Sequence, residues 1–383
     1  MRKNKVTLVL VVLILILSGY ILLQGGARMI ESWKLQIHEN LAETTEKLFL
    51  PGIYYAMNGE MEENWLEEQI QTFFPLSGYV DKKAEEATEI EDTLTYEMIL
   101  EMQAKDSERM SEDLEEQAQE TSQTEMINTE ISIEKLRDFN YLISKFYTVD
   151  STTMIYEDEL DVDKLLAKDM HIDTSSKGPK VLIFHTHSQE TFADSKTGDA
   201  STSIVGIGAY LAQKLNEKGI ETIHHDGVYD LIDGTLDRSK AYELSEIGVR
   251  EILNQNPSIE VVIDLHRDGV REDLHLVTEV DGKPTAKIMF FNGLSRTKAN
   301  GDIAYLNNPY IQDNLSFSLQ MQLASESMYP GFARKIYLKG YRYSLHMMPK
   351  SLLIEAGAQT NTVQEMKNAM DLLANILENV LIE

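Results

Sequence analysis

The sequence predicts an α/β protein in which a three-layer α/β/α domain is built around a mostly parallel sheet. From residue 178 onward, short apolar runs suited to buried strands alternate with segments of helical period. Such alternation implies helices packed on both faces of a parallel sheet. Ahead of this domain, the sequence predicts an N-terminal transmembrane helix and a mainly helical, acidic membrane-proximal region.

Each predicted element has a local signal. The run 181–184, Val-Leu-Ile-Phe, is apolar throughout, as expected for a strand buried on both faces. Gly219 ends the first helix, and Thr362 with Glu365 forms a capping box that begins the last one. The predicted strands are 181–184, 220–223, 261–265 and 352–354, the predicted helices are 204–215, 239–253, 314–327 and one from 362 onward, and a hairpin with arms at 276–280 and 286–291 turns at Asp281-Gly282.

The N-terminus predicts a membrane anchor over residues 1–28. Three positive charges precede residues 6–23, which carry no charge and are long enough to cross a hydrocarbon core of about 30 Å as a helix. The charge bias leaves the N-terminus in the cytoplasm and the rest of the chain outside. The alternative is a cleaved signal peptide, but Gln24-Gly25-Gly26-Ala27 is a poor cleavage site.

Residues 29–138 are predicted to form a membrane-proximal helical region followed by an acidic spacer. Within 81–134, eighteen acidic residues face only four basic ones, and apolar residues are sparse. A stretch of this composition stays solvated. A docking surface for a basic partner is the alternative. The remaining residues, 139–383, are predicted to form the catalytic domain, with its core from about 178.

Composition excludes several classes of function. The formal charge of −28 repels phosphate backbones, so nucleic acid is not an expected ligand. The absence of cysteine excludes disulfides, thiolate zinc sites and a cysteine nucleophile. Any metal must therefore be held by histidines and carboxylates.

Polar side chains follow three of the predicted strands. Ligands of open α/β sheets bind beyond the carboxyl ends of strands, which makes these positions the informative ones. Two imidazoles and one carboxylate around an open position form the ligand set of catalytic zinc, and His187, Glu190 and His266 would supply it. His185, Asp264 and Asp268 are candidates for holding a ligating imidazole in the right tautomer. Alternation along a continuing strand would point His185 and His187 the same way, and likewise Asp264 and His266.

Glu355 follows the apolar run 352–354 and is the candidate general base. His224-His225 is a competing cluster, of which at most one ring can join the same site because neighbouring side chains of a strand point to opposite faces. The candidate substrate contacts are Arg267, Arg342 and Asn361, although Arg342 equally fits a surface ion pair.

Six motifs together resemble one family. They are FHTHSQE at 184–190, DLHRDG at 264–269, FFNGL at 290–294, YPGF at 329–332, GYRY at 340–343 and IEAGAQTNT at 354–362. This combination is similar to the stage II sporulation protein P family, and the likeness runs from about residue 139 to the C-terminus. The family comprises membrane-anchored cell-wall hydrolases of endospore formers related to zinc-dependent N-acetylmuramoyl-L-alanine amidases.

The resemblance implies a function. It predicts a zinc enzyme that cleaves the amide between N-acetylmuramic acid and L-alanine in peptidoglycan, with possible endopeptidase activity on peptide cross-links. It also predicts action during forespore engulfment, from the mother-cell membrane facing the septal or engulfment space, with sporulation protein D and other engulfment proteins as partners.

The resemblance also assigns roles to residues. His187 and His266 occupy the places of the two zinc histidines, and Glu355 that of the catalytic glutamate. The zinc glutamate of related amidases lies further downstream, where this chain has Ala-Ser-Thr-Ser at 200–203, so Glu190 is the chosen third ligand and His185 its alternative. Ser344 stands where an asparagine is typical.

Two other functions compete with this hypothesis. One is a different metal hydrolase, such as a phosphoesterase that uses His185 with His187, although the acidic chain disfavours anionic substrates. The other is a membrane-tethered scaffold with a vestigial metal site.

Overall fold

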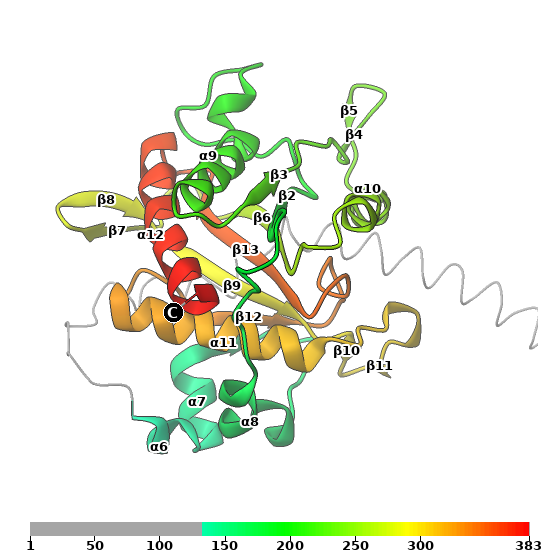
Figure 1. Ribbon diagram of the computed structural model, residues 1–383, viewed down its shortest axis with the longest axis vertical. Helices are drawn as coiled ribbons and strands as arrows, with labels where there is room; N and C mark the ends of the chain where they lie inside the picture. Colours follow the sequence, from blue (N-terminus) through cyan, green and yellow to red (C-terminus); the bar gives the residue numbers. More distant parts are fainter. Residues whose placement is uncertain (1–131, 383) are drawn as a thin grey trace, which may run out of the picture. The chain divides into compact units, whose positions relative to one another are not determined.

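The computed structural model describes residues 132–382 (Figure 1). The predicted anchor at 1–28 and nearly all of the predicted membrane-proximal region at 29–138 lie outside the described residues. Among the helices that are described, none combines the length and the apolar character needed to span a membrane.

A seven-stranded sheet forms the centre of the domain. Its order is β1 (Tyr147–Val149), β12 (Ile336–Lys339), β9 (Ile288–Gly293), β13 (Lys350–Ala358), β6 (Val261–Asp268), β2 (Val181–Phe184) and β3 (Thr222–His224). All neighbours are parallel except β13 and β9, which are antiparallel. The mostly parallel sheet is therefore confirmed, and the carboxyl ends of β13, β6, β2 and β3 share one edge.

One face of the sheet carries most of the helices. It is covered by α9 (Ile204–Glu217), α11 (Ile311–Met328) and α12 (Val363–Ile382) (Figure 1). The same core cluster includes residues from the short helices α6 (Ile133–Leu136), α7 (Phe139–Phe146) and α8 (Val162–Ala167).

The opposite face has a thinner cover. Val249 of α10 (Ala241–Gln255) shares an apolar cluster with Leu182 and Val262, and Tyr242 of the same helix shares another with Leu353. The segment 341–348 fills the rest of this face with aromatic and aliphatic side chains. The three predicted layers are present, with one helix and a loop segment forming the third.

The predicted start signal of α12 and the predicted stop signal of α9 both have the expected geometry. The Oγ1 of Thr362 accepts a hydrogen bond from the Glu365 N–H at 3.2 Å, and the Glu365 Oε2 accepts one from the Thr362 N–H at 2.9 Å. This reciprocal pair is the predicted capping box of α12. Gly219 has a φ of +81° just beyond α9, in the left-handed region that glycine adopts at helix ends.

The predicted hairpin is right in its turn and wrong in its second arm. Its strands are β7 (Val277–Val280) and β8 (Lys283–Ala286), joined through Asp281 and Gly282, both with positive φ. The stretch predicted as 286–291 instead supplies β9 to the middle of the main sheet. All residues of β9 are buried, as expected for a strand in the middle of a sheet that is covered on both faces.

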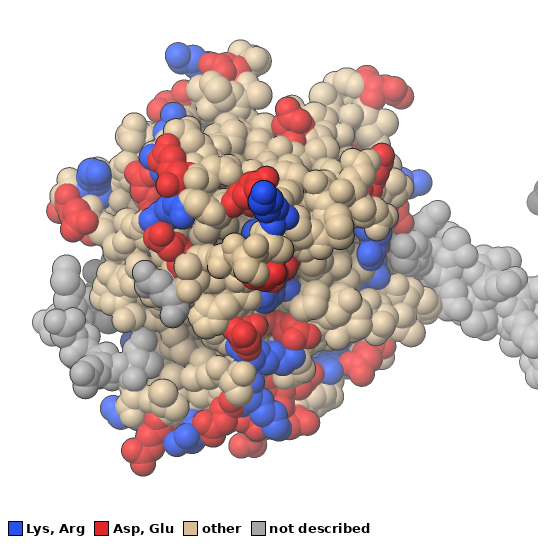
Figure 2. Space-filling view, in the orientation of Figure 1, with Lys and Arg blue, Asp and Glu red and all other residues tan. Residues whose placement is uncertain are grey.

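Short elements complete the described chain. They are the 3-10 helices at Glu157–Leu160, Ala200–Thr202 and Ala304–Leu306, and the two-residue strands β4 (Leu231–Ile232), β5 (Thr235–Leu236), β10 (Arg296–Thr297) and β11 (Gly301–Asp302). On the face seen in Figure 2, acidic and basic side chains are interspersed rather than gathered by sign.

Candidate metal centre

The candidate site lies at the shared carboxyl edge of β2, β6 and β13. His266 lies within β6, and Glu355 is its direct neighbour on β13 in the parallel register. Both strands thus run further than the predicted ends at 265 and 354. Residues 185–190 leave the end of β2 as an irregular connection and carry His187 and Glu190 to the same place.

His187, Glu190 and His266 come together as predicted. One ligand atom from each lies within 4.8 Å of the other two, and all three residues are buried. The His187 Nδ1 is 3.8 Å from the Glu190 Oε1, and the two imidazole rings are 5.0 Å apart between centroids. Within residues 132–382, these three form the group of histidine and carboxylate side chains that lie close enough together to hold a metal ion.

The hydrogen bonding of His187 fits a metal ligand. Both of its ring nitrogens are buried and have no hydrogen-bond partner among the described residues. A buried polar atom without a partner costs free energy, which a bound cation would offset by accepting a nitrogen lone pair. Two imidazoles with one carboxylate are also the ligand chemistry that zinc prefers.

Asp264 has the predicted position beside His266. Its Oδ1 lies 2.7 Å from the His266 Nε2, as expected from alternation along β6. The same carboxylate accepts hydrogen bonds from the Thr186 N–H and hydroxyl and from the Ser344 hydroxyl. Asp264 therefore fixes the orientation of the His266 imidazole through its Nε2, and the hydrogen bond from Ser344 fixes Asp264.

The electrostatics of the site favour a cation. Burial raises the pKa of Glu190, and it raises the pKa of Glu355 to about 8 although His266 opposes that shift. Burial alone would lower the pKa of His266, but Asp264, Glu190 and Glu355 raise it to about 9. Burial and the neighbouring His266 bring the pKa of His187 well below its usual value. Three buried carboxyl groups thus surround two imidazoles.

Glu355 has one oxygen available for chemistry. Its Oε2 is buried without a hydrogen-bond partner among the described residues, although His266 lies beside it in the sheet. This is the environment expected of a general base with a raised pKa, because burial disfavours the ionised form.

His185 does not join the metal group. The strand ends at Phe184, so the condition for His185 and His187 to point the same way is not met. The His185 Nδ1 donates to the Leu265 carbonyl at 2.7 Å, and its Nε2 lies 3.0 Å from the Nε2 of His224. A Cβ at Gly208 of α9 would approach the His185 ring to 2.4 Å, so this glycine makes room for the pair. His185 as third ligand, or as the group that orients one, is therefore wrong for this arrangement.

Asp268 and Arg267 lie at the margin of the site. Asp268 is paired with Arg334 at 2.6 Å, so the prediction that it orients a ligating imidazole is wrong, although its charge contributes to the raised pKa of Glu355. The backbone N–H of Arg267 donates to the Glu190 Oε2 at 2.8 Å. The guanidinium of Arg267 bonds to the Asp268 carbonyl, and its role as a substrate contact stays a prediction.

The other two predicted substrate contacts differ in outcome. Asn361 is fully buried, and its side chain bonds to the Ala358 N–H, the Leu276 carbonyl and Glu365. It closes the turn from β13 to α12, so its assignment to substrate is wrong. Arg342 lies 3.5 Å from Glu246 of α10, in agreement with the ion pair weighed as its alternative.

Three residues of the site were not anticipated. The ring of Tyr242 contacts the rings of His187 and His266, and it also belongs to the apolar cluster on its own face of the sheet. Arg238 approaches the Glu190 Oε1 to 3.8 Å, and Asp230 bonds to Ser188 and Gln189. Asp230 and Arg238 come from the stretch between β3 and α10, and Tyr242 lies in the first turn of α10. No motif in this part of the sequence predicts proximity to the site.

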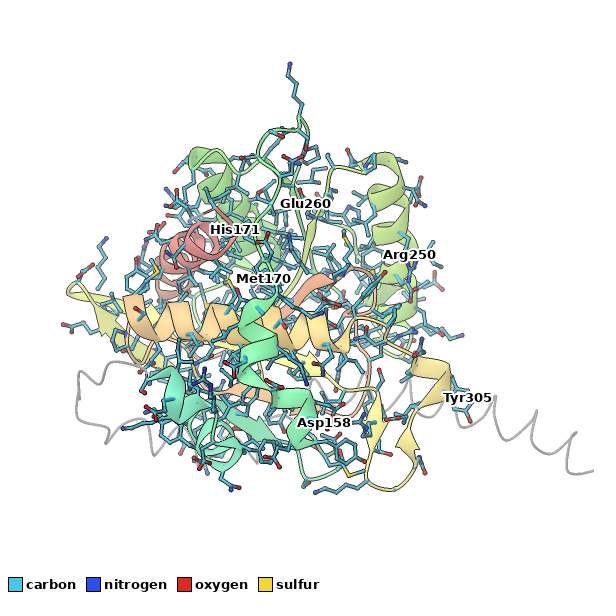
Figure 3. All side chains as sticks on the ribbon, turned by 60° about the horizontal axis from the view of Figure 1, so that its bottom comes forward. Asp158, Met170, His171, Arg250, Glu260 and Tyr305 are labelled. Atoms are coloured by element: carbon cyan, nitrogen blue, oxygen red, sulfur yellow. The ribbon has the colours of Figure 1, made fainter. Side chains whose placement is uncertain are left out.

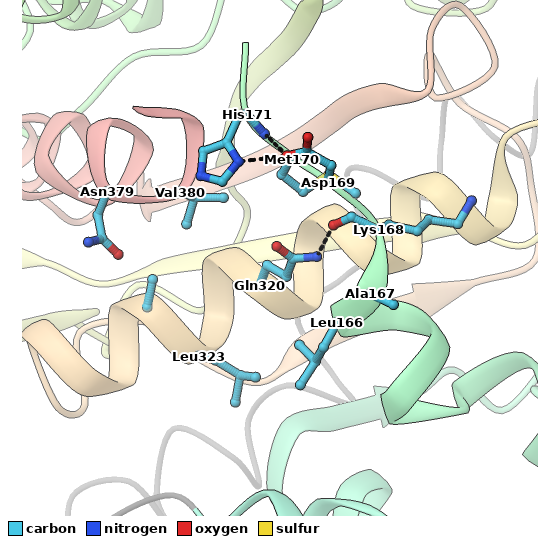
Figure 4. Close-up of a pocket in the computed structure, with 11 residues that line it drawn as sticks. Leu166, Ala167, Lys168, Asp169, Met170, His171, Gln320, Leu323, Asn379 and Val380 are labelled. Atoms are coloured by element: carbon cyan, nitrogen blue, oxygen red, sulfur yellow. Dashed lines mark hydrogen bonds and ion pairs between the residues drawn. The ribbon is translucent and has the colours of Figure 1, made fainter. Parts of the chain in front are cut away.

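A separate pocket of about 400 Å³ lies between α8, α11 and α12. Figure 3 shows Met170 and His171 beside α12, and Figure 4 shows Gln320 hydrogen-bonded to the backbone of Lys168. His171 bonds to Asp169 at the rim of this pocket. None of its lining residues belongs to the candidate metal centre.

The fold and the site define a class: an α/β domain with a buried His-Glu-His group beside a glutamate of raised pKa. The chain belongs to the stage II sporulation protein P family, whose profile matches residues 60–378. The stage II sporulation protein P of Bacillus subtilis (strain 168) is 22% identical over 228 residues, which are 56% of this chain and 54% of that protein. The chain thus spans about half the length of this curated relative.

Solved amidase structures are also similar. The CwlD amidase from Clostridioides difficile, in complex with the GerS lipoprotein, is 14% identical with a TM-score of 0.34, and the match covers 52% of this chain and 98% of that one. The N-acetylmuramoyl-L-alanine amidase AmiC2 of Nostoc punctiforme is 15% identical with a TM-score of 0.31, over 53% of this chain and 98% of that one.

Proposed function

We propose that this protein is a membrane-anchored, zinc-dependent peptidoglycan hydrolase of sporulation. It cleaves the amide between N-acetylmuramic acid and L-alanine, with peptide cross-links as a second target, during engulfment of the forespore. Membership in the stage II sporulation protein P family supports the sporulation setting. The observation that carries the enzymatic proposal is the buried group of His187, Glu190 and His266 next to the unpartnered oxygen of Glu355.

The roles of the residues follow from their contacts. His187, Glu190 and His266 would hold the zinc ion, which when bound supplies a Lewis acid that polarises the scissile carbonyl. Glu355 takes up at its Oε2 a proton from the water whose oxygen attacks the amide carbon, and it later gives that proton to the amine as the C–N bond breaks. Asp264 keeps the imidazole of His266 in one orientation, and the ring of Tyr242 stacks on that imidazole.

The setting of the enzyme is part of the proposal. Residues 6–23 anchor the chain in the mother-cell membrane with the N-terminus in the cytoplasm, and the catalytic domain faces the peptidoglycan of the septal or engulfment space. Sporulation protein D is the proposed partner there, together with other engulfment proteins.

Metal content and product identity test this function together. The purified full-length chain is expected to hold about one zinc ion, and His187→Ala or His266→Ala to abolish both zinc binding and wall hydrolysis. His171→Ala is the matched control, because His171 is exposed and lies in the separate pocket.

Labelling of new amino groups identifies the bond that is cut. Cleavage of the muramyl amide exposes the amino group of L-alanine, whereas cleavage of a cross-link exposes a different one. Full hydrolysis by either histidine variant would contradict the zinc mechanism. Zinc binding without any bond cleavage would instead favour a membrane-tethered scaffold with a vestigial site.

A further inference from the structure

The β4–β5 hairpin is an arm that begins and ends beside the metal centre. It projects past α10 away from the main sheet (Figure 1). Its apolar side chains stay exposed, with Leu231 at 40% and Leu236 at 52%. Asp230 precedes the arm and Arg238 follows it closely, and both reach the connection that carries His187 and Glu190.

Both carboxylate oxygens of Asp230 accept hydrogen bonds from the connection at residues 185–190. Asp230 is fully buried, its Oδ1 accepts from the Ser188 hydroxyl at 2.7 Å, and its Oδ2 accepts from the Gln189 N–H at 3.1 Å. The arm itself is closed by a backbone hydrogen bond from the Asp237 N–H to the Asp230 carbonyl. The side chain therefore supports the metal-binding connection, while the main chain supports the arm.

The connection needs such support because no strand pairing holds it. β2 ends at Phe184, and the next backbone pairing is the bridge between Thr191 and Ser203. Between these points, Asp264 holds Thr186 on one side of His187, and Asp230 holds Ser188 and Gln189 on the other. Two buried carboxylates thus fix the backbone on both sides of His187.

We propose that Asp230 is a positioning residue of the metal centre. It holds the turn at Ser188 and Gln189 so that His187 and Glu190 face His266 together. The inference rests on the proposed zinc function, and it extends the site to a residue more than thirty positions from any ligand in the sequence. Groups that orient ligands typically change metal affinity about 10–100-fold when they are replaced.

The test compares Asp230→Asn with the parent in the full-length chain. The amide keeps the shape of the carboxylate but places an N–H₂ group where either Ser188 or Gln189 needs an acceptor. Zinc affinity, measured by competition with a chelator, is expected to fall about 10–100-fold. Hydrogen exchange of residues 186–190 in the metal-free protein is expected to become faster. Asp233→Asn, at the exposed tip of the arm, is the control and is expected to change neither quantity.

Ser188→Ala provides a second route that does not depend on the Asp230 variant folding. It removes one of the two hydrogen bonds, and the double variant is expected to lose less affinity than the sum of the single losses, because both changes act on one contact. Parental zinc affinity together with parental exchange in Asp230→Asn would overturn the inference. Failure of the parent chain to bind zinc would contradict the proposed function instead, and the exchange result would still decide whether Asp230 holds the connection.

Discussion

The two faces of the central sheet differ in how their strands are covered. Toward α9, α11 and α12, β6 presents Ile263 and Leu265 to one large apolar cluster. Toward α10, the same strand presents Asp264 and His266. The heavily covered face supplies stability, and the thinly covered face can therefore bury polar groups at the carboxyl edge. A single strand thus serves both purposes by alternation.

The largest expected effect concerns Glu355, on the thinly covered face. Glu355→Gln is expected to keep zinc and to lower turnover about 10²–10⁴-fold, because the amide cannot accept the proton. Hydrolysis of purified wall and zinc content together check this result. Glu279→Gln, on the exposed hairpin, is the control. Near-parental turnover would assign the base to another residue, and loss of zinc would make Glu355 a ligand.

The second prediction concerns Leu265, which lies next to His266 but faces the other way. Leu265→Ala is expected to lower the free energy of unfolding by about 2–5 kcal/mol, because it leaves a cavity in a fully buried cluster. Zinc per folded chain should stay at the parental value. Denaturant unfolding and metal analysis measure the two quantities. A loss of zinc with little loss of stability would show that the two faces are not separate in function.

The smallest effect concerns the way α10 is held on its face. Burial alone would raise the pKa of Glu246, but hydrogen bonds from His346 and Arg250 and the nearby Arg342 lower it to about 2. Because this folded-state pKa lies below the unfolded value of about 4.3, the ionised group stabilises the fold above that pH. This contribution is lost as the pH falls toward 2.

Glu246→Gln tests this contribution of ionised Glu246 to stability. The variant is expected to be less stable than the parent by about 1 kcal/mol at pH 6, since the group is partly exposed. The difference should shrink below pH 4 and vanish near pH 2. Unfolding curves across this range measure it, with Glu251→Gln on the exposed side of α10 as the control. A difference that does not depend on pH would argue against an ionised Glu246.

The sequence predicted the parts of the site that lie at the ends of strands. Apolar runs place His266 and Glu355 near the carboxyl ends of two strands, and parallel strands bring such ends to one edge of the sheet. Glu190 was chosen over His185 because two imidazoles and one carboxylate form the ligand set of catalytic zinc. The structure separates them because β2 ends at Phe184, as the apolar run predicts, and the irregular connection after it directs His185 away from His187 and Glu190.

The remaining parts depend on tertiary contacts without a local signal. Asp230 and Arg238 reach the site from the connection between β3 and α10, and Tyr242 from the first turn of α10, so neither periodicity nor spacing predicts them. Asn361 was assigned to substrate, but the tight turn into α12 needs its amide for backbone groups. Strand β12 was missed because its apolar run, Ile-Tyr-Leu, is very short and borders lysines on both sides.

The central claim is that one zinc ion binds at the carboxyl edge of β2, β6 and β13, held by His187, Glu190 and His266. Anomalous diffraction from crystals of the zinc-loaded protein, recorded on both sides of the zinc absorption edge, tests it directly. The account predicts one peak at about 2.0–2.2 Å from a nitrogen of each histidine and an oxygen of Glu190. A peak beside His185 and His224, or no peak with zinc in excess, would contradict it.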